Sequence, residues 1–325
     1  MKNRDKFRFL DLPIVVTRNV LSTMNPFDIL DLSRTSKRGR WYAKLKQFPS
    51  DIPVVMLEKC PHLMIEYEGN WYDFVMTDEK EKDRKRETEI DDTYGKQFEI
   101  VYVYSNNIMK DFNKLYTNAI SVMNKKIRCI SFWMNPLEGR IEESVKWVKL
   151  RFPTIDCITI IGQNVPQKDV QYILDNITPT LILRLMAETK EKLPLRIKGT
   201  FEQLMIENGS WITVDHATNF SFPYVAFMGT TITNQELNLI LKNWIDMKCH
   251  LNTKQFEINL MDKENFLDTV LENIPYEIGQ PIVPVNLYHN LVGEGCDIKR
   301  IDGLEASVYT CEGTMGLVMG LKTKN

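Results

Sequence analysis

A short apolar frame that recurs through the second half of the chain limits the fold more than any other feature. In its first copy the apolar residues Ile127, Ile130 and Phe132 are followed by Asn135. Similar frames begin at residues 155, 178, 201, 222 and 253, at intervals of 28, 23, 23, 21 and 31 residues. The frames at 178 and 253 keep only their second and third apolar positions. Such a period is typical of one supersecondary unit repeated along the chain.

The intervals between the frames are mostly helical in character. In 235–245, for example, Leu237, Leu241 and Trp244 lie on one side of a helix. A strand followed by a crossover helix, repeated, predicts a parallel sheet with the helices outside it. The frame matches leucine-rich-repeat spacing, but only Asn135 keeps the Asn position, so a generic α/β sheet stays an alternative. Further helices are expected over 109–123, 142–150 and 167–177.

The last 50 residues leave this pattern. Residues 282–291 and 298–321 have extended character and are interrupted by glycine-containing turns, such as Asp302-Gly303. We expect hairpins that close the end of the sheet. Before these residues, the segment 195–198 is a candidate for one further strand outside the regular pattern.

Residues 1–47 have the pattern of three short helices. Pro13 can begin the first, Asn25-Pro26 caps the second, and Ser36 caps the third. This segment holds 11 Lys/Arg and 4 Asp/Glu, although the whole chain has 41 and 43. Three helices of this length bury little surface by themselves, so a partner or a neighbouring domain should cover their apolar faces.

The three helices have two other interpretations, the second of which is raised by the basic third helix. One is a helical cap on a larger domain, and the other is a helix-turn-helix that reads DNA. Trp41 and Leu45 are four residues apart and call for burial, which disfavours DNA reading because a recognition helix needs exposed polar side chains. The basic residues are Arg34, Lys37, Arg38, Arg40, Lys44 and Lys46.

Residues 48–105 contain short β-branched and aromatic runs, which favour an antiparallel sheet or meander. The runs are 54–57, 63–68, 71–76 and 98–104, with Gly69-Asn70 as a turn. Between the last two lies the segment 78–92, in which 13 of 15 residues are charged. We expect this segment to be a solvated loop, with a regulated or partner-binding linker as the alternative.

Catalytic and metal-binding patterns are hard to find. The histidines are His62, His216, His250 and His289, and neither Cys60-Pro61-His62 nor Cys249-His250 has the spacing of a tetrahedral metal site. The six cysteines contain no C-x-x-C pair, which suits reduced thiols in the cytoplasm or nucleus. We therefore expect no enzyme activity, no cofactor and no metal, and we expect Trp211 and Trp244 to pack in the core.

The start of the chain is charged and runs into no long apolar segment, and no 18 consecutive residues are apolar. We expect neither secretion nor a membrane span. Balanced charges also argue against a general affinity for nucleic acid.

The N-terminal residues resemble the F-box, in particular its nematode form. The resemblance is carried by Leu10-x-Leu12-Pro13, Val20-Leu21, Met24-x-Pro26 to Ser33, and Thr35 to Arg38, and it departs from the usual pattern at Gly39 to Tyr42. The resemblance implies binding to Skp1, and through Skp1 to a cullin. The implied Skp1-contacting residues are Leu10, Leu12, Pro13, Ile14, Val20, Leu21, Met24, Leu30 and Leu32.

The second half resembles the type 2 F-box-associated domain of nematode F-box B proteins. The similar segments are 201–213, Asp215-His216, 233–244 and the closing Arg300-x-Asp302-Gly303-x-x-Ala306. Residues 217–223 depart from the family pattern, so a weakened helix or a shifted strand is expected there. The resemblance implies that this domain binds the substrate, without indicating which residues do so.

Together these observations predict an α/β protein (α+β overall) that acts as a non-catalytic substrate adaptor of an SCF ubiquitin ligase. The competing class is a ligase-independent scaffold or a DNA-associated repeat protein. The predicted regions are an F-box at 1–47, a β-rich connection at 48–105, and at 106–325 a degenerate repeat-like domain with a mainly parallel sheet and C-terminal hairpins.

Overall fold

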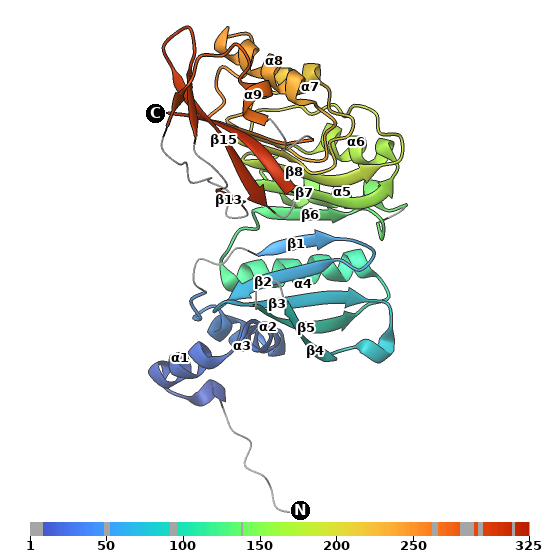
Figure 1. Ribbon diagram of the computed structural model, residues 1–325. Helices are drawn as coiled ribbons and strands as arrows, with labels where there is room; N and C mark the ends of the chain where they lie inside the picture. The colour runs from blue at the N-terminus through green and yellow to red at the C-terminus, as the bar shows by residue number, and fades with distance from the viewer. Residues whose placement is uncertain are drawn as a thin grey trace, which may run out of the picture. The chain divides into compact units, whose positions relative to one another are not determined.

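The computed structural model divides the chain into two compact units, Met1–Arg140 and Ile141–Asn325 (Figure 1). Within the described ranges, no helix is both long and apolar enough to cross a membrane. The structure describes residues 9–48, 53–91, 96–137, 139–261, 266–279, 289–291, 295–313 and 316–324.

The first unit packs helices against a sheet with the strand order β6-β1-β2-β3-β5-β4 (Figure 1). Its helices are η1 (Phe9–Asp11), α1 (Ile14–Thr23), α2 (Pro26–Thr35), α3 (Lys37–Ala43), η2 (Lys80–Lys82) and α4 (Ile108–Met123). Its strands are β1 (Val54–Leu57), β2 (His62–Tyr67), β3 (Asn70–Thr77), β4 (Arg86–Asp91), β5 (Lys96–Tyr104) and β6 (Cys129–Trp133).

This sheet is not the simple meander that the sequence suggested. Strands β1, β2 and β3 are antiparallel neighbours, with a turn at Glu68-Gly69 in which both residues have positive φ. Strand β5, however, runs parallel to β3. The change of direction arises because the charged segment 78–92 contributes a strand of its own, β4, that pairs antiparallel with β5.

The expectation that 78–92 is a solvated loop is therefore wrong for its second half. Strand β4 ends the strand order of this unit, and the side chains of residues 86–90 are exposed. An edge position lets the backbone pair on one side while the charged side chains remain in water, and edge charges are a common protection against further pairing. Charge content alone does not exclude such a strand.

Helix α4 and strand β6 also belong to the first unit. β6 pairs parallel with β1, with Ile130 opposite Val55, and both side chains are fully buried. The sequence had grouped these two elements with the repeat-like region. The predicted region boundaries at residues 47 and 105 stay predictions. The structure divides the chain into its two units after residue 140.

The second unit has a mixed sheet, in which a parallel part is followed by antiparallel strands, so the predicted mainly parallel sheet describes only its first part. Strands β7 to β11 lie side by side in chain order, and each adjacent pair is parallel. Strands β16, β15, β14 and β12 follow in the sheet, and each pairs antiparallel with the strand before it. The strands are β7 (Cys157–Val165), β8 (Ile182–Thr189), β9 (Gln203–Ile206), β10 (Tyr224–Phe227), β11 (Gln255–Asn259), β12 (Glu277–Ile278), β13 (His289–Leu291), β14 (Cys296–Lys299), β15 (Glu305–Gly313) and β16 (Gly316–Thr323).

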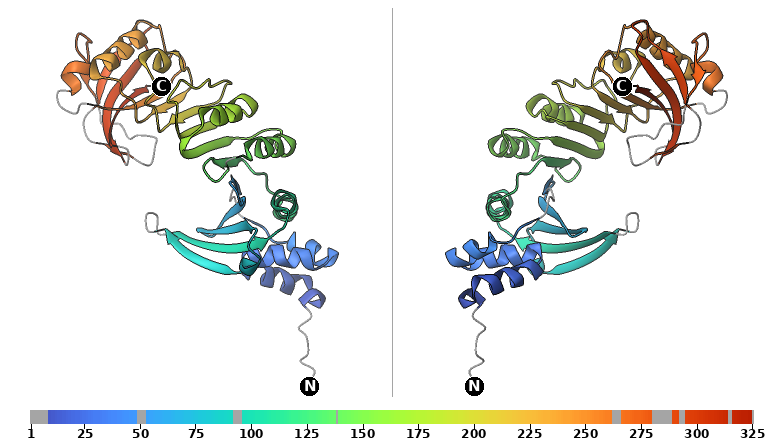
Figure 2. Two further views of the ribbon diagram at one scale, coloured as in Figure 1. Left: turned by 90° about the vertical axis from the view of Figure 1, so that its right-hand side faces the viewer. Right: turned by 90° about the vertical axis from the view of Figure 1, so that its left-hand side faces the viewer.

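Helices of the second unit connect these strands, and α5 and α6 lie along one face of them (Figure 2). Trp244 in α8 is fully buried and Trp211 nearly so, which confirms that both are core residues. The helices are α5 (Ile141–Arg151), α6 (Gln167–Asn176), α7 (Val214–Asn219), α8 (Asn234–Ile245) and α9 (Phe266–Val270).

Side chains alternate across the parallel strands, as the pleat requires. Leu183, Leu204, Val225 and Phe256 occupy neighbouring positions and are buried on one face. The residues directly before and after these positions point to the opposite face of the sheet, which we call the open face. At one register level this face carries Ile182, Gln203, Tyr224 and Gln255.

Two local expectations about this unit have clear outcomes. Residues 195–198 form no strand, because the backbone of Arg196 exchanges hydrogen bonds with the side chain of Gln171 instead of with a neighbouring strand. Helix α7 is only six residues long, in keeping with the weak helix expected near Ala217. The predicted extended residues 282–288 lie outside the described residues.

Candidate functional site

Helices α2 and α3 begin where the capping residues predicted, and α1 begins at Ile14, directly after Pro13. The side chain of Asn25 accepts a hydrogen bond from the backbone N–H of Asp28 at 3.0 Å, with Pro26 at the first helical position. The hydroxyl of Ser36 accepts one from the N–H of Gly39 at 2.9 Å. These bonds satisfy N–H groups that have no partner inside a helix.

Helix α2 is covered by its own unit. The ring of Phe27 packs edge-on against Phe74, with 4.8 Å between centroids, and against Tyr72, with 5.3 Å. Ile29 and Leu30 are 0% exposed. The side-chain amide of Asn118 in α4 also donates to the hydroxyl of Ser33 at 2.7 Å. The sheet and α4 thus act as the neighbouring domain that the short helices require.

Lys46 holds the C-terminal end of α1. Its buried ammonium donates hydrogen bonds to the carbonyl oxygens of Leu21, Ser22 and Met24 at 3.0, 3.2 and 2.5 Å. It also lies 3.0 Å from the hydroxyl of Tyr67 in β2. Burial lowers the pKa of Lys46, while the charge of Glu68 acts in the opposite direction. A cation at this position complements the carbonyl end of the helix dipole.

The first turn of α1, in contrast, presents apolar side chains to solvent. Ile14, Val15 and Val16 are 40%, 66% and 43% exposed. Pro13 beside them is exposed as well. We call Pro13–Val16 the apolar turn. Adjacent exposed apolar side chains of this kind often mark a site of interaction.

The nine residues implied to contact Skp1 fall into different environments. Pro13 and Ile14 are exposed, Leu12, Val20, Met24 and Leu32 are half-buried, and the side chain of Leu10 lies outside the described residues. Leu21 and Leu30 are 1% and 0% exposed, so as they stand they are core residues and supply no contact surface. The periodic pattern marks apolar faces but does not say which of them the chain itself covers.

Three exposed apolar residues were missed or misjudged, namely Val15, Val16 and Trp41. Val15 belongs to a run of three consecutive apolar residues, and such a run cannot face one core because successive helix positions are about 100° apart. Trp41 was expected to be buried, but it is 55% exposed because its neighbour Tyr42 takes the core position. The two rings are in edge contact, with centroids 5.0 Å apart.

Exposed basic side chains gather at the end of α2 and in α3. Arg34, Lys37, Arg38 and Arg40 are all exposed. Arg38 pairs with Asp11 at 3.3 Å, and Arg40 donates to the side-chain oxygen of Asn118 at 2.9 Å. An apolar centre with a charged rim is the usual composition of a protein interface.

The first unit also contains a charged cluster around His62. Its ring nitrogens lie 2.8 Å from Oδ2 of Asp73 and 2.5 Å from Oε1 of Glu58. Burial alone would lower the pKa of His62, but the hydrogen bonds and charges of Asp73 and Glu58 raise it to about 9. Across the described ranges, no three His, Cys, Asp or Glu residues gather as a metal site.

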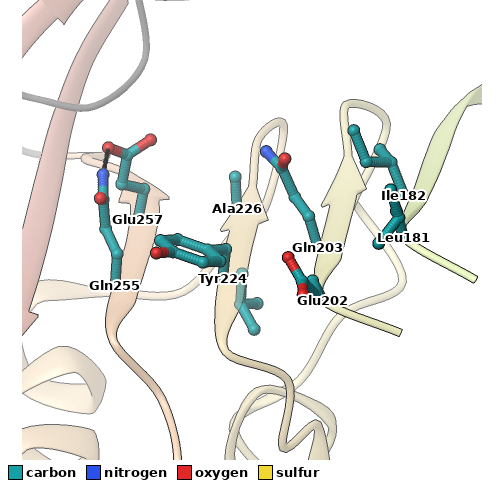
Figure 3. A pocket seen from close by; sticks show the side chains of 9 residues that line it. Leu181, Ile182, Glu202, Gln203, Tyr224, Ala226, Gln255 and Glu257 are labelled. Carbon is teal, nitrogen blue, oxygen red and sulfur yellow. Dashed lines mark hydrogen bonds between the residues drawn. The ribbon is translucent and has the colours of Figure 1, made fainter. Parts of the chain in front are cut away.

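The second unit has a pocket of about 250 Å³ on the open face of β8 to β11 (Figure 3). Gln203, Tyr224 and Gln255 project from three neighbouring strands, and Glu257 lies beside Gln255 (Figure 3). The full lining is Leu181, Ile182, Glu202, Gln203, Tyr224, Val225, Ala226, Gln255 and Glu257. The sequence had left the substrate-binding residues unknown. Glu202 and Gln203 lie in the segment 201–213 that carries the resemblance, but the resemblance gave them no role.

The closing motif of the resemblance has a structural role. Arg300 is 7% exposed and forms two hydrogen bonds to Asp302, at 2.9 and 2.7 Å. Its guanidinium carbon lies 5.5 Å from the ring centroid of Trp244. These contacts join the turn after β14 to α8, and the hydrogen bonds from Arg300 lower the pKa of Asp302 to about 2.

Comparisons with known proteins agree with this arrangement. An F-box domain matches residues 9–38, and an F-box associated family matches residues 193–258. The Skn-1 dependent zygotic transcript 15 protein of Caenorhabditis elegans is 26% identical over 198 residues, which cover 58% of this chain and 56% of that protein. The match thus spans little more than half the length of that relative. No solved structure shows significant similarity to the chain.

The chain therefore contains an F-box followed by an F-box-associated domain. With a nematode relative, this combination confirms the resemblance to nematode F-box proteins. F-box domains generally bind Skp1 within SCF complexes, and proteins of these two families are generally non-catalytic adaptors.

Proposed function

We propose that this protein is the substrate-recognition subunit of an SCF ubiquitin ligase in the cytoplasm or nucleus. Its N-terminal helices bind a Skp1-like protein, which connects it to a cullin, and its second unit binds a target protein. In this role the chain is a non-catalytic adaptor. By holding the target near the ubiquitin-charged enzyme, it raises the effective concentration of target lysines.

The observation that carries this proposal is the apolar turn. Ile14, Val15 and Val16 are exposed inside the segment that matches the F-box, whereas Ile29 and Leu30 of the same segment are fully buried. Burial of an exposed aliphatic side chain is favourable by about 1.5–3 kcal/mol. The apolar turn thus offers a compact interface centre, and the half-buried Leu12, Val20, Met24 and Leu32 extend it.

The double variant Ile14→Asp/Val16→Asp tests this proposal. The full chain is co-expressed with a tagged Skp1-like protein, and the amount that co-purifies is measured. We expect near-complete loss of co-purification, because two carboxylates would be desolvated in an apolar interface. Leu150→Asp, at a helix position that is 72% exposed, is the matched control and should retain binding.

Circular dichroism and thermal unfolding show whether the double variant remains folded, as its exposed sites predict. A folded double variant that still co-purifies with Skp1 would refute the proposal. Point variants are preferable to deletion of the helices, because deletion would also remove Phe27 and Lys46 from contact with the sheet.

The competing class, a DNA-associated repeat protein, gains some support from the exposed basic residues of α3. Salt distinguishes the two classes. DNA binding through several phosphate contacts weakens about 10³–10⁵-fold between 50 and 200 mM salt. Binding of Skp1 through the apolar turn should change little over the same range.

A further inference from the structure

The first unit contains a groove between helix α2 and strands β4 and β5. Its volume is about 700 Å³, within the range of about 300–1,000 Å³ that is usual for ligand sites. Phe27 and Phe74 are the buried members of its lining, and Val101 and Val103 are half-buried. The charged members of the lining are exposed, so a ligand in solution can reach them.

Three arginine side chains line this groove from separate segments of the unit. Arg34 lies in the last turn of α2, Arg84 in the turn between η2 and β4, and Arg86 at the start of β4. Their side chains are 39%, 92% and 47% exposed. Every basic residue of the lining is an arginine, whose planar fork of N–H donors matches the geometry of phosphate and carboxylate groups.

Contacts within the unit hold two of these arginines in place. The backbone N–H of Arg84 donates to the carbonyl oxygen of Tyr102 at 2.9 Å, which fixes the turn against β5. The guanidinium carbon of Arg86 lies 5.3 Å from the ring centroid of Phe27, and its Nη2 donates to Oδ1 of Asp28 at 3.3 Å. A ligand therefore meets positive groups whose positions are already set, which lowers the entropic cost of binding.

The guanidinium groups of Arg34 and Arg84 keep their donors available. Nη1 of Arg34 lies 3.7 Å from Oδ1 of Asp31, and Nε of Arg84 lies 3.9 Å from Oδ2 of Asp83. Both distances are too long for a hydrogen bond. Among the residues that the structure describes, the two arginine side chains donate no hydrogen bond. Exposed ion pairs of this length are weak, so a bound anion can compete with both aspartates.

The same two arginines also repel each other. Burial lowers the pKa of the Arg34 guanidinium, the charge of Asp31 acts in the opposite direction, and the like charge of Arg84 lowers the pKa further. An anion that accepts hydrogen bonds from both guanidinium groups would offset this repulsion. A phosphate monoester carries close to two negative charges and three acceptor oxygens, so it can contact two arginines at once. A carboxylate has one charge and is a poorer match.

We propose that this groove binds a phosphoserine or phosphothreonine side chain of another protein. The phosphate oxygens accept hydrogen bonds from Arg34 and Arg84, and the adjoining peptide contacts Val101 and Val103. The site lies in the first unit, so it is additional to the binding of a target by the second unit. Its chemistry does not depend on the proposed function.

Retention of the full chain on peptide beads tests this assignment. The beads carry a degenerate peptide library with phosphothreonine at the central position, and counterpart beads carry threonine or glutamate there. At 150 mM salt we expect at least about tenfold greater retention on the phosphothreonine beads than on either counterpart. Equal retention on the glutamate beads would overturn the assignment, because any acidic side chain would then suffice. Equal retention on beads that carry a single-stranded DNA oligomer would assign the arginines to nucleic acid and would overturn it too.

Two protein variants locate the binding site. Arg34→Gln and Arg84→Gln should each reduce retention on the phosphothreonine beads at least about fivefold, because each removes charged donors to the phosphate. Arg18→Gln removes one positive charge from an exposed position in α1 outside the groove lining and should leave retention unchanged. Both groove arginines are exposed, so their variants should fold, and circular dichroism checks this. Unchanged retention of the two folded variants would contradict the proposed site.

This measurement needs no Skp1, so its outcome is separate from that of the co-purification experiment. The double variant Ile14→Asp/Val16→Asp changes no residue of the groove lining and should bind the phosphothreonine beads like the unaltered chain. Selective binding of phosphothreonine by a chain that fails to bind Skp1 would support the groove and reject the adaptor. Skp1 binding without selectivity for phosphothreonine would reject the groove and leave the adaptor supported.

Discussion

The ammonium nitrogen of Lys46 lies 3.0 Å from the hydroxyl oxygen of Tyr67, and this contact connects the chain after α3 to strand β2. The same ammonium donates to three carbonyl oxygens at the end of α1. The last carbonyls of a helix have no partner within it, so this one side chain both caps α1 and attaches it to the sheet. The position of the apolar turn depends on that attachment.

Replacing Lys46 with methionine should destabilise the first unit. The variant keeps most of the aliphatic stem but removes the donor that Lys46 supplies to the carbonyl oxygens of Ser22 and Met24. We expect a loss of about 2–3 kcal/mol in the free energy of unfolding, measured by urea titration. Lys44→Met, at an exposed position two residues earlier, should change it by less than about 0.5 kcal/mol. Equal stability of the two variants would contradict the role given to Lys46.

The cluster around His62 should make the first unit less stable at alkaline pH. The pKa of His62 is about 9 in the folded chain, because Asp73 and Glu58 outweigh the effect of burial, and about 6.5 when unfolded. The folded state therefore binds the proton more tightly. Its contribution of about 3 kcal/mol is fully present below pH 6.5 and is lost as the pH rises through 9.

Unfolding titrations between pH 6 and 10 measure this dependence. His62→Gln should flatten the alkaline decline, and Glu58→Gln should reduce it because one of the two carboxylates that favour the charged ring is gone. An alkaline decline in His62→Gln as steep as in the unaltered chain would show that other groups cause it.

Sequence patterns identified most helices and strands but not what covers them. The F-box resemblance implied Leu21, Leu30 and Ile14 alike as apolar contact residues, yet only Ile14 is exposed. Leu30 lies in the same helix as Phe27, whose ring packs against Phe74, 47 positions later in the chain. Contacts so distant in sequence are set by tertiary packing, which local periodicity does not contain.

Strand β4 and the open-face pocket show the same limit in other forms. The charges of β4 predict solvent exposure correctly, but its pairing with β5 depends on an edge that only the assembled sheet provides. In the pocket, Gln255 and Glu257 look like ordinary alternating strand residues. Their contacts with Tyr309, more than 50 residues later, arise from the antiparallel strands that close the sheet.

Replacing Gly320 with alanine should disturb those closing strands. Gly320 lies opposite Tyr309 in the β15–β16 pair, and a Cβ atom at Gly320 would be 2.1 Å from the Cζ atom of Tyr309. Because Tyr309 is fully buried, its ring cannot move without displacing neighbours. We expect a loss of about 1–3 kcal/mol in the free energy of unfolding.

A double-mutant cycle checks the cause of that loss. Tyr309→Ala removes the ring and leaves a cavity, so it should itself be destabilising. If the clash is with this ring, Gly320→Ala should cost far less in the Tyr309→Ala background than alone. Strictly additive effects would place the strain elsewhere.

The second unit should lose stability on the acid side because of His250. Burial lowers the pKa of this side chain to about 4, although the backbone at Ala217 acts in the opposite direction. When unfolded, the same group has a pKa near 6.5 and takes up a proton first. Stability is therefore unaffected by this group above pH 6.5 and falls by about 3 kcal/mol as the pH decreases from 6.5 to 4.

His250→Asn should remove this part of the acid decline, and asparagine suits the positive φ of 52° at this position. His216→Asn, at a half-buried position, should retain the decline in thermal unfolding measured between pH 4 and 7. An unchanged acid slope in His250→Asn would contradict the role of the buried ring.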